Sequence, residues 1–312
     1  MNNLKVYATG AKGEGLTSAP ATAPIQQQTG PPPPSITIVL QITNPAPGAT
    51  ITADSVLVRG LVDAGGFEVG VSVNGLATNL SGTQWAVEIP VVLGSNTVAA
   101  TATTVTGAQA TASISVQVTQ VQEPGITLKA SPVSGLGPLT VRFEVESGLD
   151  RPIVQFEFDT DGDGSFDVTS GSFENVEVTY RAPGLLSPTL RVTDDQDRIV
   201  TTKTLVHVLD TVTTMAMFER KWDTFKAALA ARDIPRATGE FALGVRPRFQ
   251  QVFQALAPVL PTIAPTLGPV AITQVREGLA EGVTQRVQGG KMYLYFIYWA
   301  PDADGIWRII EM

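Results

Sequence analysis

A short acidic segment has the residue types and the spacing of a site for a hard cation. The segment DTDGDGSFD, residues 159–167, places a carboxylate at alternate positions and a glycine at position six. In loops of this spacing, oxygens from positions one, three, five, seven and nine surround calcium, and the glycine permits a sharp turn. The sequence therefore predicts a calcium site formed by Asp159, Asp161, Asp163, Ser165 and Asp167.

The predicted calcium site departs from the full pattern at its last position. Position twelve, where a bidentate glutamate usually completes the shell, is Ser170. A carboxylate from another loop is needed there, and the candidates are Asp194, Asp195 and Asp197. Because no helix is expected on either side, the segment is interpreted as a loop on a β-hairpin. The alternative is an acidic, glycine-rich turn that binds nothing.

The predicted role of calcium is structural rather than catalytic. Four carboxylates within nine residues repel one another unless a cation lies between them, so binding would stiffen the surrounding fold. The chain has one histidine, His207, and no cysteine, which excludes Ser-His-Asp and Cys-His nucleophile sets as well as disulfides. We expect no enzymatic activity, and His207 is interpreted as a structural residue of a strand. Asp302-Ala303-Asp304-Gly305 indicates a hairpin turn.

The charge distribution limits the class of partner. Between Ser35 and Asp210 there are 19 acidic and 8 basic side chains, whereas the remainder up to Met312 has 9 acidic and 11 basic ones. An acidic surface does not favour nucleic acid, whose phosphates need clustered lysine and arginine. No apolar run approaches the ~18 residues of a membrane span. The first residues also lack the apolar centre of a secretion signal, so export by another route, or a mature or partial N-terminus, is expected.

The segment 35–122 alternates short apolar strands with turns about every ten residues, as in a β-sandwich. Trp85 is its expected core anchor. The stretches ITNPAPGATITADSVLVRG, VSVNG and WAVEIPVVLGSNTVAATATTVTG resemble the bacterial immunoglobulin-like domain found beside glucodextranase catalytic domains. The resemblance implies a spacer or binding module without catalytic residues.

The segment 123–210 contains the acidic loop and is predicted to be a second sandwich. The stretches FEFDTDGDG and YRAPG, which begin at Phe156 and Tyr180, resemble the aromatic-Asp-Phe-Gly-Asp-Gly turn and the Tyr-x-x-Pro-Gly corner of the polycystic-kidney-disease (PKD) repeat. The first motif carries an insertion here. The resemblance implies an extracellular β-sandwich used for spacing, adhesion or mechanical extension.

The segment 211–312 changes from a strand period to a helical one. Apolar residues at steps of three and four indicate a helix from Met215 to Leu229, Asp233 is an expected helix cap, and strand-like runs follow from Val270. The stretches MFERKWDTFKAALAARDIPRAT and YLYFIYWAPDADGIWRIIEM resemble the cone-shaped nuclear-transport-factor-2-like family. The resemblance implies an α+β domain with a central pocket. The candidate polar residues of that pocket are Arg246, Arg248, Arg276, Tyr293, Tyr295 and Tyr298.

Alternation in the last segment suggests a different role for its aromatic residues. Tyr293 and Tyr295 alternate with Met292, Leu294 and Phe296, a pattern interpreted as a sheet buried on one face.

Taken together, the three segments predict the fold class: a multidomain chain of two all-β immunoglobulin-like sandwiches followed by an α+β cone-shaped domain. Residues 1–34, with four consecutive prolines from Pro31, form a Pro-rich extended tail.

Three functions are compatible with these features. The first is a non-catalytic extracellular or cell-surface structural or adhesion protein. It is calcium-stiffened and forms a homo-oligomer or polymer through its N-terminal tail and C-terminal domain, as a fibre or surface subunit would. The second is an accessory region of a secreted carbohydrate-active enzyme, which binds glycan or acts as a spacer. The third is a small-ligand binder that uses the C-terminal cone.

Overall fold

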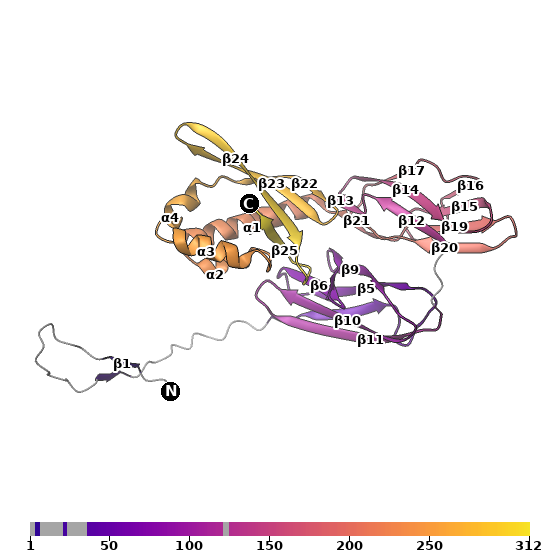
Figure 1. Cartoon of the computed structure of the whole chain (residues 1–312), viewed down its shortest axis with the longest axis horizontal. Coiled ribbons are helices and arrows are strands. Elements are labelled where there is room, and N and C mark those ends of the chain that lie inside the picture. Colours follow the sequence, from indigo (N-terminus) through magenta and orange to yellow (C-terminus); the bar gives the residue numbers. More distant parts are fainter. Residues whose placement is uncertain (1–3, 7–20, 24–35, 121–124) are drawn as a thin grey trace, which may run out of the picture. The chain divides into compact units, whose positions relative to one another are not determined.

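The computed structural model describes residues 4–6, 21–23, 36–120 and 125–312, and these residues are mostly β-strands with a small helical part (Figure 1). Two compact units are present, 1–36 and 37–312. In the first unit, β1 (Leu4–Val6) pairs antiparallel with β2 (Ala21–Ala23). The remainder of the predicted tail lies outside the described residues.

The first sandwich, residues 37–120, has two sheets, in the strand orders β3-β5-β9-β8 and β4-β11-β10-β6-β7. Neighbouring strands are antiparallel except β4 and β11, which are parallel. Its strands are β3 (Val39–Asn44), β4 (Thr50–Ile51), β5 (Ser55–Asp63), β6 (Val69–Val73), β7 (Leu76–Ala77), β8 (Asn79–Ser81), β9 (Gln84–Pro90), β10 (Gly94–Thr104) and β11 (Gln109–Val118). Valines of both sheets pack around Trp85, which is buried, so the predicted core anchor is confirmed.

The second sandwich, residues 125–209, encloses a core of its own that includes Phe143, Phe158 and Tyr180. One sheet has the order β12-β14-β17, and another has the order β16-β15-β19-β20. The strands are β12 (Ile126–Ser131), β13 (Ser134–Leu136), β14 (Leu139–Ser147), β15 (Ile153–Asp159), β16 (Val168–Ser170), β17 (Val176–Tyr180), β18 (Gly184–Leu186), β19 (Thr189–Asp194), β20 (Ile199–Lys203) and β21 (Val206–Leu209). The predicted β-sandwich architecture of this part is therefore confirmed.

The C-terminal part packs helices against a sheet. Its elements are α1 (Thr211–Ala230), α2 (Ile234–Gly239), α3 (Arg246–Leu256), α4 (Leu260–Ile263), a 3₁₀ turn (Ala264–Thr266), β22 (Val270–Arg276), β23 (Leu279–Gln288), β24 (Lys291–Pro301) and β25 (Trp307–Glu311). Asp210 caps α1 by accepting from the Thr213 amide, and Asp233 caps α2 by accepting from the Arg236 amide, as predicted for Asp233.

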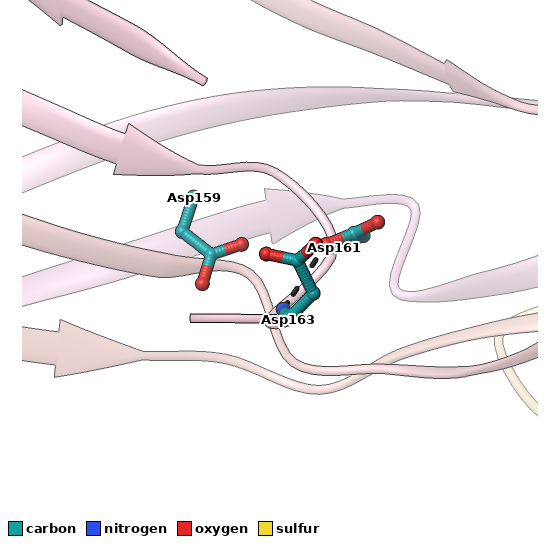
Figure 2. A group of neighbouring side chains, drawn as sticks. All are labelled: Asp159, Asp161 and Asp163. Carbon is teal, nitrogen blue, oxygen red and sulfur yellow. Dashed lines mark hydrogen bonds between the residues drawn. The ribbon is translucent and has the colours of Figure 1, made fainter. Parts of the chain in front are cut away.

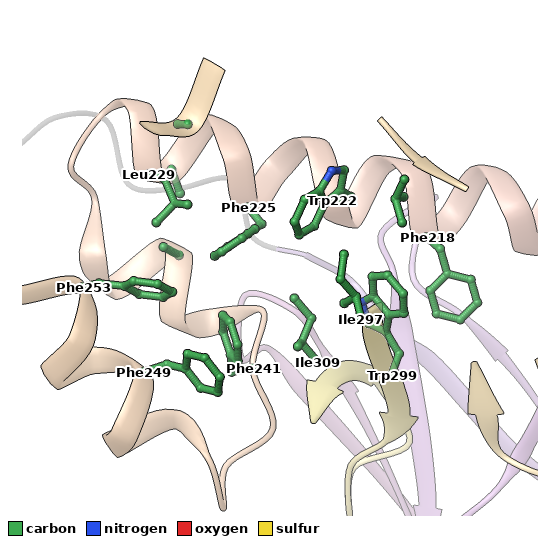
Figure 3. Close-up of a cluster of buried hydrophobic side chains, with 14 of the residues drawn as sticks. Phe218, Trp222, Phe225, Leu229, Phe241, Phe249, Phe253, Ile297, Trp299 and Ile309 are labelled. Atoms are coloured by element: carbon green, nitrogen blue, oxygen red, sulfur yellow. The ribbon is translucent and has the colours of Figure 1, made fainter. Parts of the chain in front are cut away.

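The core of this part is filled with aromatic side chains (Figure 3). Phe218, Trp222 and Phe225 line the inner face of α1 and meet Trp299 of β24, as the helical period predicted. On α3 the buried stripe is narrow. Phe249 and Phe253 are buried, whereas Val252 and Leu256 are 41% and 38% exposed.

Within residues 37–312 the three cores are joined by contacts between residues far apart in the sequence. The hydrophobic periodicity of the sequence did not predict these contacts. The strand order β18-β21-β13-β22-β23-β24-β25 runs from the second sandwich into the C-terminal part, through one bridge between Gly135 and Arg276. Lys221 of α1 is buried and pairs with Glu68 of the first sandwich at 2.7 Å. A buried lysine needs such a partner, so this ion pair fixes α1 against the first sandwich.

No helix among the described residues is both long and apolar enough to cross a membrane.

Gly60 of β5 provides a test of how tightly the first core is packed. A Cβ placed on Gly60 would overlap the Trp85 ring and the Gln41 carbonyl oxygen, so Gly60→Ala is expected to destabilise the sandwich by about 1–3 kcal/mol. Gly171→Ala is the matched control, because a Cβ there meets nothing within 4 Å. Denaturant unfolding measures both, and equal stabilities of the two variants would contradict the packing described.

Candidate functional site

The acidic loop lies at the tip of a hairpin, where the strand ladder brings its two ends together. Asp159 is the last residue of β15, and Val168, the first of β16, pairs with Phe158. The Asp167 amide donates to the Phe158 carbonyl at 2.9 Å. Positions one and nine of the loop are therefore neighbours across the hairpin, although the loop itself is irregular.

Asp159 anchors the loop from within. Its side chain is buried, and its two oxygens accept separate backbone amides, from Gly162 at 2.7 Å and from Gly164 at 2.8 Å. Both glycines have positive φ, +84° and +97°, a conformation that L side chains rarely adopt. The two glycines thus let the chain fold back over the carboxylate.

Asp161 and Asp163 extend the same winding toward solvent. One oxygen of Asp161 accepts the Asp163 amide at 3.1 Å, and one oxygen of Asp163 accepts the Ser165 amide at 2.7 Å. Carboxylate oxygens of Asp159, Asp161 and Asp163 lie within 4.8 Å of one another, and the carboxylates of Asp159 and Asp163 face each other (Figure 2). Each of the outer two side chains keeps one oxygen for a ligand.

Of the five predicted ligands, Asp159, Asp161 and Asp163 converge in the structure. Ser165 and Asp167 make other contacts. Asp167 accepts from the Thr160 amide at 2.7 Å and from the Thr160 hydroxyl at 2.6 Å, and these bonds lower its pKa. Asp167 therefore closes the loop in this arrangement. Ser165 uses its amide to hold Asp163. Calcium binding by these residues stays a prediction.

The three candidates for a completing carboxylate do not lie near the loop. Along β15, Asp159 is opposite Thr189, whereas Asp194 is opposite Ile153 at the other end of the strand. The Asp194 carboxylate accepts the amides of Gln196 and Arg198 at 3.0 and 2.9 Å. The proposal of Asp194, Asp195 or Asp197 as the completing ligand is therefore wrong, because the antiparallel register sends their turn away from the loop.

The donor set of the loop fits a hard cation such as calcium. All the side-chain atoms that converge are carboxylate oxygens, the ligands that Ca²⁺ prefers. The clustered carboxylates make the local field negative. Burial, together with the charges of Asp161, Asp159 and Asp167, raises the pKa of Tyr180. Tyr180 donates its hydroxyl to the Thr160 carbonyl at 2.5 Å and so fixes the loop to β17.

A connection that the sequence did not reveal joins the loop to the first sandwich. The Ser187 amide donates to the Asp161 carbonyl at 3.2 Å, and Gly162 lies against the Ser187 backbone so closely that a Cβ would overlap it. Arg59 of β5 donates to the Ser187 hydroxyl and, at 3.3 Å, to the Leu185 carbonyl. Burial lowers the pKa of this guanidinium. No local pattern marks Arg59, since its partners are more than a hundred residues away.

The remaining polar candidates have structural partners. Arg308 forms a two-pronged ion pair with Asp304, both bonds 2.7 Å long, and also reaches Asp302 at 3.2 Å. This pairing gives both carboxylates of the predicted hairpin turn at 302–305 a structural partner. His207 is buried in β21, opposite Ser134 and Leu185, as a structural residue of a strand would be.

The six predicted pocket residues of the C-terminal part lie on different elements. Arg246 donates to the carbonyls of Gly239 and Phe241, and Arg248 lies over the Phe249 ring. Arg276 ends β22, and Tyr293, Tyr295 and Tyr298 lie on β24. Because aromatic side chains fill the space between helices and sheet, the structure gives no support to a ligand pocket there.

The prediction that Met292–Phe296 belongs to a sheet buried on one face is wrong. All five side chains are between 41% and 63% exposed. The reason is the extent of the neighbouring strands: β22 pairs with β23 only as far as Thr284, and β25 pairs with β24 only as far as Tyr298. The outer part of β24 therefore has only β23 beside it among the described strands.

Comparison with known proteins gives partial likenesses only. No protein-family model and no curated protein matches this chain. The fibronectin(III)-like modules of CbhA from Clostridium thermocellum are 16% identical over 56% of this chain and 96% of theirs, with a TM-score of 0.23. The glucan-utilisation protein SGBP-B of Bacteroides ovatus, solved with a mixed-linkage heptasaccharide, is 15% identical over 55% of this chain and 47% of its own, with a TM-score of 0.20.

A third solved structure, the modular endo-β-1,4-mannanase of Cellulomonas fimi, is 27% identical over 26% of this chain, with a TM-score of 0.21. This chain covers 18% of that enzyme. At these TM-scores the overlays do not define a common arrangement of the whole chain.

His207 gives the fold a defined pH dependence. Burial lowers its pKa to about 4, from an ordinary value near 6.5, so the unfolded chain takes up the proton first as pH falls. The stability that depends on neutral His207 is complete above about pH 6.5 and is lost progressively toward pH 4. The difference in unfolding free energy between the wild type and His207→Gln should shrink by on the order of 2 kcal/mol from pH 7.5 to pH 5. A constant difference would contradict burial of a neutral imidazole.

Proposed function

We propose that this chain is a non-catalytic, extracellular structural protein in which calcium stiffens the joint between the two sandwiches. The observation that carries the proposal is the convergence of Asp159, Asp161 and Asp163 within 4.8 Å at a hairpin tip that is itself bonded to the 185–187 segment. The finer identities that the sequence suggests, PKD-like for the second sandwich and cone-shaped for the C-terminal part, belong to the same proposal.

The electrostatics of the loop explain why a cation would stiffen it. Without a cation, like charges at this separation oppose the wound conformation, and only backbone amides offset them. A bound Ca²⁺ turns that repulsion into attraction and holds the backbone of Asp161 and Gly162 in place. Because Ser187 is bonded to Asp161, and Arg59 to Ser187, the first sandwich is held by the same chain of contacts.

The incomplete ligand set supports an extracellular setting. Ser170, at position twelve, pairs with Phe156 in the strand ladder, so it is not placed to act as a bidentate ligand. A loop with fewer charged ligands binds calcium weakly, and dissociation constants of about 10⁻⁴–10⁻³ M are those of extracellular modules. Self-association through the tail and the C-terminal part belongs to the same proposal. Glycan binding is the alternative proposal.

Calcium binding is tested with the whole chain by calorimetric titration and thermal unfolding. At free calcium of about 100 times the dissociation constant, the wild type should gain ~2.7 kcal/mol of stability. Asp163→Asn should abolish that gain, yet without calcium it should be no less stable than the wild type, because one repelling charge is gone. Asp197→Asn, at the far turn, is the matched control and should keep the full gain. A wild type that binds no calcium at millimolar concentration would contradict the proposal.

The joint is tested separately with Arg59→Met, which keeps an apolar stem but removes the hydrogen bonds to Leu185 and Ser187. If calcium strengthens this contact, loss of the contact must weaken calcium binding, because coupling between two sites is reciprocal. The expected result is a several-fold rise in the calcium dissociation constant. Lys203→Met is the control at an exposed strand end. If Arg59→Met leaves the calcium dissociation constant unchanged, calcium binding is not coupled to the contact between the sandwiches.

A further inference from the structure

The outer parts of β23 and β24 form a two-stranded ribbon, defined here as residues 285–297, that continues past the rest of its sheet (Figure 1). Pairing between the two strands extends to Val287 and Met292 and beyond them to the Gly289-Gly290 turn. An isolated two-stranded ribbon is at best marginally stable in water. Its long outer edge is formed by β24, which β25 leaves unpaired beyond Tyr298.

The ribbon has two faces of different chemistry. Directly opposite residues of paired strands share a face, so the register puts Met292 with Val287 and Phe296 with Val283, and Leu294 lies between them on the same face. Tyr293, opposite Arg286, lies on the other face together with Tyr295. One face is therefore apolar except for Gln285, which lies opposite Leu294, and the other face carries tyrosines.

After Lys291, the β24 edge of the ribbon lacks the features that normally protect a strand edge. Such edges are usually blunted by charges, prolines or bulges, because unpaired backbone groups are a template for another strand. Between Lys291 and Pro301, β24 carries neither an internal charge nor a proline, and its bulge lies at the far end, between Tyr298 and Trp299. The edge is thus open to pairing along Met292–Ile297.

We propose that β24 pairs edge to edge with β24 of a second copy of this chain, antiparallel across a two-fold axis at Leu294. In that register Met292 lies opposite Phe296 of the second copy, Tyr293 lies opposite Tyr295, and Leu294 lies opposite its own counterpart. The two apolar faces then form one surface of a four-stranded sheet. Lys291 lies opposite Ile297, so no like charges meet.

A second copy supplies what the β24 edge lacks. Pairing along Met292–Ile297 gives the unpaired backbone groups of each copy a partner, and it adds a strand on the open side of a ribbon that is marginally stable by itself. A glycan is a poorer occupant, because the apolar face offers mainly apolar side chains where sugar hydroxyls need polar partners. The inference deepens the self-association part of the proposed function and does not depend on calcium.

Sedimentation of the whole chain between about 1 and 100 µM, with calcium and with chelator, is the first test. The wild type should form a dimer in both conditions, and Leu294→Glu should be monomeric, with the melting temperature that the wild type has at a concentration where it is itself dissociated. Leu93→Glu is the matched control, because Leu93 is 67% exposed and Leu294 is 58% exposed, and it should remain dimeric. A monomeric wild type, or a dimer that survives Leu294→Glu, would overturn the proposal. Loss of calcium binding alone would leave it standing and would count only against the calcium site.

Cross-linking then tests the register. The natural chain contains no cysteine, so Leu294→Cys introduces a single thiol. Opposite residues on paired strands have Cβ atoms about 4.5–5.5 Å apart, close to the range for a disulfide. Mild oxidation should give a covalent dimer of Leu294→Cys and none of Leu93→Cys at the same concentration. Equal cross-linking of both variants, or a monomeric chain that binds glycan through Tyr293 and Tyr295, would replace this proposal with another.

Discussion

The confinement of three carboxylates to one turn is the constraint on which this account depends. Asp159 is buried with both oxygens bonded to amides, and Asp161 and Asp163 each accept one amide, so four backbone dipoles hold charges that would otherwise separate. Those dipoles are enough to shape the loop, but they leave carboxylate oxygens turned toward a common space. A hard cation is the simplest species that completes such an arrangement.

The acidic loop is linked to more than its own hairpin, because a few polar contacts join the three cores of residues 37–312. Arg59 connects the first sandwich to the 185–187 segment, and Lys221 connects it to α1 through Glu68. Lys221 is buried, so removing Glu68 would leave its charge without compensation, whereas Arg59 is partly buried and bonded to neutral groups. Burial also raises the pKa of Glu240, the second carboxylate near Lys221. The rigidity of residues 37–312 therefore rests on a handful of specific bonds as well as on apolar packing.

Local patterns predicted the elements well, and non-local contacts account for what they missed. Strand alternation, the helical period of α1 and the cap at Asp233 depend on neighbours in sequence, as does the spacing of the acidic loop. The place of Asp194 depends on the register of β15 with β19, and the partners of Arg59 lie on another sandwich, so neither could be found from spacing. The aromatic alternation of β24 predicted a buried sheet, but β22 and β25 are too short to cover it, so it is exposed.

The proposed contact between two β24 strands is symmetric and closes after two copies. A filament would therefore need a second contact elsewhere on the chain.

Amide hydrogen exchange, measured by mass spectrometry or NMR with calcium and with chelator, tests the central claim most directly. The amides of Gly162, Gly164 and Ser187 donate to the loop, and they report both the winding and its bond to the neighbouring segment. The account predicts that calcium slows exchange at residues 159–167 and 185–187 together, and leaves the far turn at Asp194–Arg198 unchanged. Exchange at 185–187 that ignores calcium, while the loop itself responds, would contradict a calcium-stiffened joint.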